Sequence, residues 1–281
     1  MKSSSRFLSW RSHKNSEALV RGEHGSAVSA PAATYWPRDL LPRTISDARI
    51  LTYGYDADVV GGLFKGASKN NITQHGQDLM LKLEREVEGE PIVFIAHSLG
   101  GILVKEGLHW SKSHLSPRYR QLHHHTRHVV FLGVPHRGSQ MANEMGETLI
   151  RLAAASLRDT NKHLLASLEV ENELLDRINT EFMKMVQLSD FSVYSFQEGS
   201  GLTGLKGFSG KVVSDFSSKL GHPLEIVETV RGNHMEMARF SDANDEGYRT
   251  VSRVIARCVI DSQQDHKRDR PLAGSTLDSE S

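Results

Sequence analysis

Short apolar runs, separated by longer amphipathic stretches, predict alternating strands and helices along the chain. Residues 92–95 and 129–134 are almost continuously apolar, which is typical of strands buried on both faces of a parallel sheet. Residues 48–55 alternate in polarity and carry β-branched and aromatic side chains, and this pattern also favours a strand. The last two predicted strands are residues 191–196 and 224–230.

Helical periodicity connects these runs. Residues 72–87, 101–110 and 246–259 have apolar side chains at helical spacing with charges between them. The longest helical tract, residues 142–188, lies between two predicted strands, and we interpret it as a helical cap whose leucines also pack against the sheet. The strand-then-helix order predicts an α/β fold with a doubly wound, mostly parallel sheet, and ligands outside the carboxyl ends of its strands.

The chain of 281 residues suits one large domain, which we assign to residues 35–260. Residues 1–34 are expected to be poorly ordered or degenerate. The first 22 are basic and rich in serine, which is typical of a mitochondrial transit peptide or of a disordered polar start. Residues 261–281 have few apolar side chains, so we expect a disordered tail.

Charge and composition exclude several functions. Lys and Arg number 34, equal to Asp and Glu, so no net field attracts nucleic acid. No apolar run approaches the roughly 20 residues of a membrane-spanning helix, so any membrane contact would be peripheral. One cysteine, Cys258, excludes an intrachain disulfide and suits a reducing compartment. We therefore expect an intracellular protein, in the cytoplasm or associated with mitochondria or the endoplasmic reticulum.

The strongest chemical signal is a serine at the junction of a buried strand and a helix. Ser98 lies in IVFIAHSLGG, with Ala96 two residues before it and Gly100 two residues after. This strand–turn–serine–helix pattern is that of the nucleophile elbow of α/β-hydrolases, whose tight turn needs small neighbours. The backbone N–H of Leu99 would then point toward a developing oxyanion.

A serine hydroxyl needs a neighbouring base. In this fold the base follows the last strand, and His234 comes four residues after Val230. Two carboxylates are candidates for orienting the imidazole. Glu198 lies just past a predicted strand, whereas Asp215 is closer to the histidine along the chain but in a less regular segment. We favour Glu198 and keep Asp215 as the alternative.

A cluster of histidines in the middle of the chain could indicate a metal site. His123, His124, His125 and His128 cluster, but no HExxH or CxxC spacing accompanies them. We predict a solvated loop there. The sequence therefore predicts no metal and no cofactor.

Several segments together resemble the serine-active-site-containing branch of lipase-like α/β-hydrolases, a group that includes fungal-type serine esterases. The resemblance covers about residues 35–257 and is carried by YWPRDLLP, ILTYGYDADV, IAHSLGG, GVPHRGS and NHMEMARF. It implies an esterase or lipase-like acyl hydrolase acting on small-molecule or lipid esters, with Ser98 as nucleophile and His234 as base.

One departure from this family pattern leaves a second hypothesis open. Members usually begin with an apolar strand and a His-Gly loop that supplies a second oxyanion donor. Here only His24-Gly25 precedes the YWPRDLLP segment, and Ala18–Val20 would be a degenerate remnant of the strand. Two expectations follow: either this remnant forms the strand, or the hydrolase sheet lacks its first strands. The alternative function is a catalytically impaired or truncated hydrolase that acts as an interaction or signalling module.

Overall fold

The computed structural model describes residues 8–9, 34–55, 69–136, 169–188, 190–205 and 208–269. Its centre is a four-stranded sheet in the order β3-β4-β5-β8, in which every neighbouring pair is parallel. The strands are β3 (Ile92–His97), β4 (Thr126–Leu132), β5 (Ser192–Glu198) and β8 (Glu225–Val230). All four were predicted, and each end lies within three residues of its predicted position.

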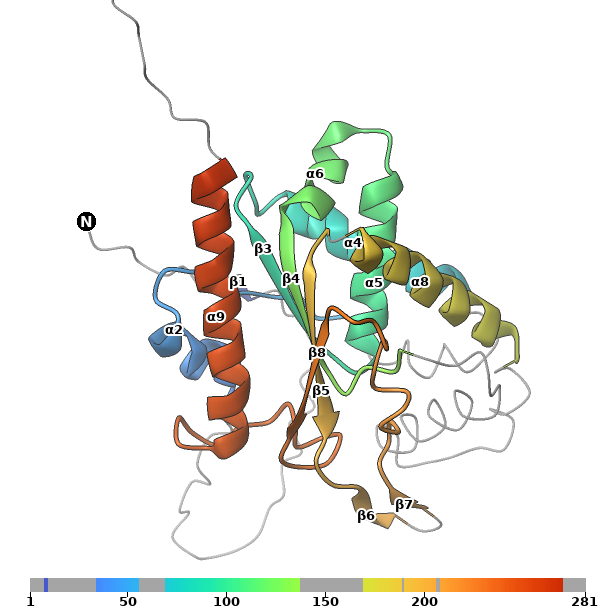
Figure 1. Ribbon diagram of the computed structural model, residues 1–281, viewed down its shortest axis with the longest axis vertical. Coiled ribbons are helices and arrows are strands. Elements are labelled where there is room, and N and C mark those ends of the chain that lie inside the picture. Colours follow the sequence, from blue (N-terminus) through green and yellow to red (C-terminus); the bar gives the residue numbers. More distant parts are fainter. Residues whose placement is uncertain are drawn as a thin grey trace, which may run out of the picture.

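Helices cover both faces of this sheet (Figure 1). One layer contains α4 (Lys69–Glu84), α5 (Leu99–Ser113), α6 (Pro117–His125) and α8 (Glu169–Gln187). The opposite layer contains α9 (Glu246–Asp269) and the short helices α1 (Trp36–Asp39) and α2 (Leu41–Thr44). This arrangement confirms the predicted α/β fold class with a doubly wound parallel sheet.

The central strand β4 shows why an unbroken apolar run was needed. Val129 and Phe131 belong to the core cluster beneath α4, α5 and α8, whereas Val130 and Leu132 belong to the cluster beneath α9. Successive side chains of a strand point to opposite faces, so a strand covered on both faces must be apolar at consecutive positions. All four of these side chains are at most 1% exposed.

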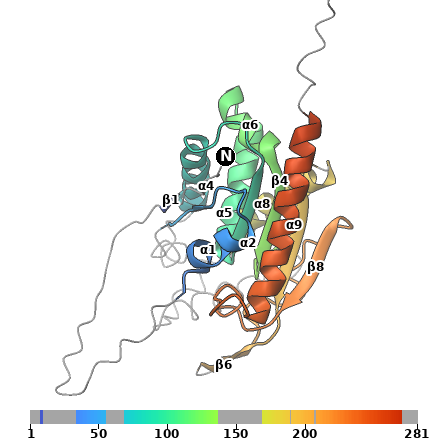
Figure 2. The same ribbon diagram turned by 90° about the vertical axis from the view of Figure 1, so that its left-hand side faces the viewer.

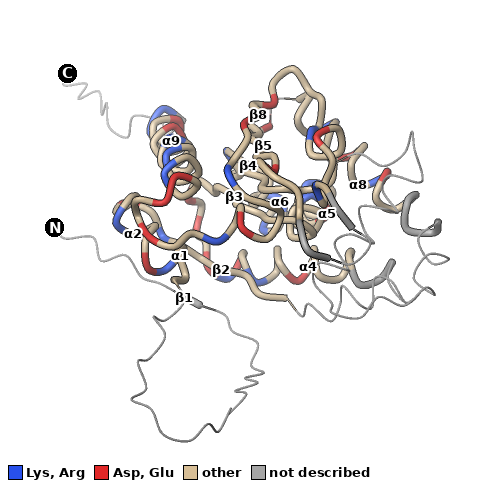
Figure 3. The backbone as a smooth tube through the Cα atoms, turned by 90° about the horizontal axis from the view of Figure 1, so that it is seen from below, with Lys and Arg blue, Asp and Glu red and all other residues tan. Residues whose placement is uncertain are grey.

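Two further strand pairs lie outside the main sheet. β1 (Leu8–Ser9) pairs in parallel with β2 (Leu51–Thr52), and β6 (Leu202–Leu205) forms a hairpin with β7 (Phe208–Gly210). In Figure 3, β2 lies between β1 and the four strands of the main sheet. The predicted strand at 48–55 is thus reduced to two paired residues, because no described strand lies beside the rest of it.

The predicted cap at 142–188 is described only in its final part. Residues 142–168 lie outside the described residues. The remaining helix, α8, buries Phe182, Met185 and Val186 in the same cluster as the strands. This part of the tract therefore packs on the sheet, as its spacing of apolar residues every three or four positions requires.

The prediction of a solvated histidine-rich loop is wrong. His123 lies in α6 and is 3% exposed, and His128 lies in β4 and is 7% exposed. The His123 ring contacts Phe191, and its Nε2 atom is 3.2 Å from Asp190 Oδ2. Burial lowers the pKa of His123 to about 4. A neutral histidine can pack in a core beside aromatic rings. The polar residues around these histidines in the sequence concealed their burial.

The prediction of a disordered tail from residue 261 onward is wrong for residues 261–269. α9 continues through Asp269, so residues 261–269 are helical. Arg257 and Asp261 pair one turn apart, and Gln263 Nε2 donates a hydrogen bond to the carbonyl of Asp47 at 3.1 Å. These contacts stabilise a helical segment that has few apolar side chains. Residues 270–281, the rest of the predicted tail, lie outside the described residues, as do residues 1–7 and 10–33 of the predicted N-terminal segment.

One lysine of α5 is buried in this core. Lys105 is 2% exposed, its Nζ donates to Asn179 Oδ1 at 3.1 Å, and the same atom lies 5.6 Å from the centre of the Phe131 ring. Burial lowers the pKa of Lys105 to about 7. An unfolded lysine keeps its proton up to about pH 10.4, so the unfolded chain binds more protons between these values. The free energy of unfolding should therefore rise as the pH increases from about 7 to 10.

Lys105→Met should remove this pH dependence. The variant has no charge to desolvate, so we expect its free energy of unfolding near pH 7 to exceed that of the parent by about 1–4 kcal/mol. Urea unfolding of both proteins at several pH values measures the difference. The prediction is contradicted if the free energies of unfolding of the two proteins change with pH in the same way across this range.

Candidate active site

Ser98 occupies a strained turn between β3 and α5. Its φ of 54° and ψ of −131° make it the only residue other than glycine with a positive φ among those the structure describes. Such a conformation costs of order 1–3 kcal/mol and persists only when its surroundings hold it. The Ser98 N–H donates to the carbonyl of Leu132 at 3.0 Å, which fixes the turn against β4. The sequence pattern of the elbow thus corresponds to an elbow in the structure.

The glycines after Ser98 differ in how tightly they are packed. A Cβ at Gly101 would lie 2.5 Å from both methyl carbons of Val134, whereas one at Gly100 would meet only Tyr55 Oη at 3.9 Å. Gly101 therefore allows the close approach of α5 to the end of β4.

Gly101→Ala should destabilise the fold, whereas Gly100→Ala should not. Overpacking at Gly101 is expected to lower the free energy of unfolding by about 1–3 kcal/mol. At Gly100 the higher helix propensity of alanine should leave stability unchanged or slightly raised. Chemical unfolding of the two variants compares them directly, and equal effects would contradict this account of the packing.

His234 lies in a turn that follows β8. The Oδ1 atom of Asn233 accepts hydrogen bonds from the N–H groups of Met235 and Glu236 at 3.0 and 3.2 Å. The Glu236 carboxylate accepts in return from the N–H of Asn233 at 3.2 Å. This reciprocal pair resembles a capping box, and it holds the turn that presents the imidazole. The His234 side chain is 1% exposed.

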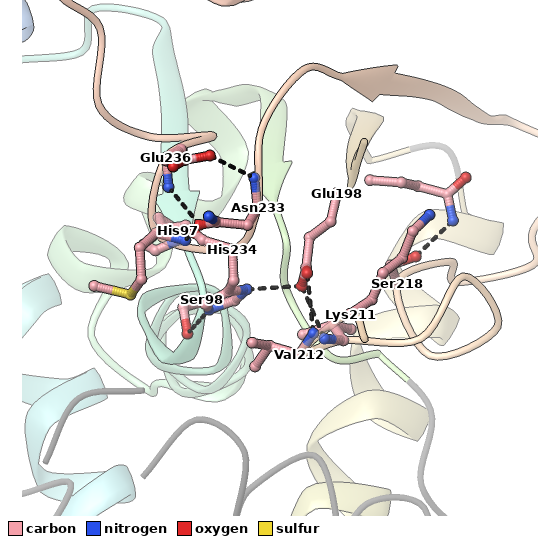
Figure 4. A network of polar contacts seen from close by, with 12 residues as sticks. His97, Ser98, Glu198, Lys211, Val212, Ser218, Asn233, His234 and Glu236 are labelled. Atoms are coloured by element: carbon pink, nitrogen blue, oxygen red, sulfur yellow. Dashed lines mark hydrogen bonds and ion pairs between the residues drawn. The ribbon is translucent and has the colours of Figure 1, made fainter. Parts of the chain in front are cut away.

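Ser98, His234 and Glu198 form one continuous set of polar contacts (Figure 4). The Oγ atom of Ser98 is 3.0 Å from His234 Nε2, and His234 Nδ1 is 2.9 Å from Glu198 Oε1. A carboxylate can only accept a hydrogen bond, so we assign the proton of the neutral ring to Nδ1. Nε2 is then free to accept the proton of the serine hydroxyl.

Backbone amides hold Glu198 at the end of β5. Its two carboxylate oxygens accept from the N–H groups of Val212 and Val213 at 3.0 and 2.8 Å, and its side chain is fully buried. β5 pairs with β8 so that Glu198 faces Val230 in register. This pairing places the carboxylate beside the turn that carries His234.

Asp215, the alternative acid, has different partners. Its Oδ1 accepts from Lys211 Nζ at 2.6 Å, and its backbone carbonyl accepts from Gln197 Nε2 at 2.9 Å. The Asp215 side chain is 59% exposed. The structure therefore brings Glu198, and not Asp215, into contact with His234.

His97 lies against His234, and the sequence reasoning missed it. The two rings are 4.8 Å apart, and His97 Nε2 lies 2.8 Å from the backbone carbonyl of His234. Burial lowers the pKa of His97 to about 4, so the ring is neutral at pH 7 and donates this hydrogen bond. The signal in the sequence that could have identified His97 is its position directly before Ser98.

Leu99 is the first residue of α5, a position whose N–H has no acceptor within its own helix. His24-Gly25, the sequence candidate for a second oxyanion donor, lies outside the described residues. Among the described residues, no three His, Cys, Asp or Glu side chains gather as a metal site would require. No helix there is long and apolar enough to span a membrane.

Three comparisons relate this chain to known proteins. No family model matches the chain. The chain is 27% identical to Protein SERAC1 of Bos taurus over 194 residues and 29% identical to that of Danio rerio over 201 residues. Each match covers 68% of this chain, and the chain spans 28% of the length of these relatives. Among solved structures, the mature Bacillus licheniformis lipase BlEst2 gives a TM-score of 0.39 at 16% identity, over 66% of this chain and 74% of the lipase.

Proposed function

We propose that this protein is a serine hydrolase that cleaves carboxylic esters through Ser98, His234 and Glu198. The observation that carries this proposal is the pair of hydrogen-bond distances that links the strained serine to the buried glutamate through one imidazole, 3.0 and 2.9 Å. Arrangements of this kind activate a serine for attack on an acyl carbon.

In the first half-reaction, His234 Nε2 takes the proton of Ser98 Oγ as the oxygen attacks the ester carbonyl. The resulting imidazolium has its Nδ1–H directed at Glu198, whose negative charge stabilises it. The oxyanion lies near the N–H of Leu99 at the start of α5, where the helix also contributes a partial positive charge. The alcohol then leaves with the proton from His234, and an acyl-enzyme remains.

In the second half-reaction, His234 takes a proton from water, and the hydroxyl oxygen attacks the acyl carbon bound to Ser98. The acid is released and Ser98 recovers its proton. No step requires a metal or a cofactor. His97 acts as a positioning residue, because it holds the backbone of His234 through a hydrogen bond of 2.8 Å.

The proposed substrates are small-molecule or lipid esters. A thioesterase or acyltransferase would use the same three residues and differ in the leaving group or the acceptor. The proposed location is inside the cell, in the cytoplasm or associated with mitochondria or the endoplasmic reticulum, which suits a chain whose single cysteine, Cys258, cannot form an intrachain disulfide.

Labelling with a fluorophosphonate probe tests the proposal. The probe reacts covalently with activated serines, so we expect the purified protein to be labelled and Ser98→Ala to lose all labelling. A thermal unfolding curve of each sample shows that the tested protein is folded. Folded protein that remains unlabelled would reject the hydrolase and favour the interaction or signalling module.

A further inference from the structure

The carboxylate of Glu198 is held by a loop that the chain forms between β7 and β8. Val212 and Val213 donate their N–H groups to its two oxygens at 3.0 and 2.8 Å (Figure 4). These two bonds set the direction in which the carboxylate faces His234, whose Nδ1 is 2.9 Å from Glu198 Oε1. The geometry of the site therefore depends on where this loop, residues 211–218, lies.

The 211–218 loop passes the carboxyl end of β5. The hairpin of β6 and β7 lies beyond this end of the sheet (Figures 1 and 2). Because β8 runs parallel to β5, the chain must return toward the opposite end of the sheet before β8 begins. Residues 211–218 are turns and bends, so no strand ladder fixes them, and individual contacts must set their position.

Gln197, the residue before Glu198, supplies such contacts. Its Nε2 donates to Ser218 Oγ at 2.6 Å and to the backbone carbonyl of Asp215 at 2.9 Å. Neighbouring side chains of a strand point to opposite faces, so Glu198 and Gln197 bond to the loop from two sides of β5. Glu198 bonds near the start of the loop, and Gln197 bonds near its end.

The Gln197 amide occupies a position where packing alone would favour an apolar side chain. Val193, four residues earlier on the same face of β5, belongs to the core cluster beneath α4, α5 and α8. Gln197 itself is 7% exposed. Burying an amide costs free energy unless it is hydrogen-bonded, and here the two N–H donors of the amide have two acceptors on the loop. These bonds to the loop are what the glutamine contributes and an apolar residue would not.

We propose that Gln197 is a positioning residue for the reaction at Ser98. It holds the 211–218 loop in the place from which two backbone amides direct Glu198 toward His234. This inference rests on the proposed function. The Gln197 amide bonds to the loop and not to Ser98 or His234, so its effect on the reaction passes through Glu198.

Gln197→Met removes the two N–H donors and keeps the length of the side chain. The Asp215 carbonyl retains the hydrogen bond from Ser218 Oγ at 3.2 Å, so no buried acceptor there loses all of its partners. The loop also keeps a backbone hydrogen bond from the N–H of His136 to the carbonyl of Ser217 at 2.6 Å. The variant should therefore fold, and a thermal unfolding curve checks this.

The expected result is a fall in kcat for p-nitrophenyl butyrate of about 10²-fold with little change in KM, because a displacement of about 1 Å in a reacting geometry costs this much. Ser195→Ala is the matched control. Ser195 lies two residues earlier on the same face of β5, is 1% exposed, and its Oγ has no hydrogen-bond partner among the described residues. The control should keep the parent kcat, and an unchanged kcat in Gln197→Met would overturn the proposal.

A double-mutant cycle distinguishes positioning from a general loss of structure. If Gln197 acts through Glu198, then adding Gln197→Met to Glu198→Gln should lower kcat by no more than about twofold beyond Glu198→Gln alone, since residues that act as a unit are non-additive. A purely structural role would give the same fall in both backgrounds. A further fall of about tenfold or more in the Glu198→Gln background would therefore overturn the proposal.

Hydrogen exchange tests the loop without any assay of hydrolysis. In Gln197→Met, the amides of Val212 and Val213 should exchange about tenfold faster or more, because the loop that carries them opens more often. Ser195→Ala should leave their exchange unchanged. Unaltered exchange in Gln197→Met would overturn the proposal. If the parent protein hydrolyses no ester, the proposed function fails, and this exchange measurement alone decides whether Gln197 holds the loop.

Discussion

Ser98→Ala should lower kcat/KM for p-nitrophenyl butyrate by about 10⁴–10⁶-fold. The substitution removes the oxygen that lies 3.0 Å from His234 Nε2, and loss of the nucleophile in a serine protease costs up to about 2 × 10⁶ in turnover. Any residual rate would come from substrate binding and oxyanion stabilisation alone. Release of p-nitrophenol, followed by absorbance, measures the effect.

Ser217→Ala provides a matched control. Ser217 is 1% exposed, and its Oγ has no hydrogen-bond partner among the described residues. Removing this hydroxyl therefore changes a buried serine without touching the proposed chemistry, and kcat/KM should stay near that of the parent. If Ser98→Ala keeps the parent activity, Ser98 is not the nucleophile.

Glu198→Gln should lower kcat by about 10³–10⁴-fold with little change in KM. The neutral amide can no longer stabilise the imidazolium that forms on His234, and loss of the corresponding charge in serine proteases has effects of this size. The amide nitrogen of glutamine also cannot accept the hydrogen bonds that Val212 and Val213 donate to the carboxylate. The same p-nitrophenyl assay, run over a range of substrate concentrations, separates kcat from KM.

Asp215→Asn is the control for the choice of acid. Asp215 is exposed and pairs with Lys211, so the variant should retain nearly all of the parent kcat. The measured stability of both variants shows whether a loss of rate reflects unfolding. The assignment is reversed if Asp215→Asn loses the activity and Glu198→Gln keeps it.

The local sequence pattern was sufficient to predict those helices and strands whose surroundings are the same along their whole length. β3 and β4 are covered on both faces, so their burial is visible as consecutive apolar residues. In amphipathic helices such as α4 and α9, the buried face is likewise visible in the sequence, as apolar residues that recur at the helical period. The elbow at Ser98 was also visible, because its tight turn admits only small neighbours at defined positions.

Local pattern failed where burial depends on partners distant in sequence. His123 and His128 have polar neighbours along the chain, but they pack against Phe191 and Tyr194 on β5 or just before it. The end of α9 has few apolar residues, and one of its contacts is with Asp47, more than 200 residues earlier. A window of neighbouring residues carries no information about such contacts.

The sequence by itself determined the fold class, the elbow at Ser98 and the position of His234 after the last strand, because each depends on residue types at short, defined spacing. Only the tertiary structure shows which of the two carboxylates contacts His234. Glu198 reaches His234 because β5 and β8 pair in a register that sets Glu198 opposite Val230, and two backbone amides hold its carboxylate there. Strand register arises from packing across the whole sheet, and no short stretch of the chain encodes it.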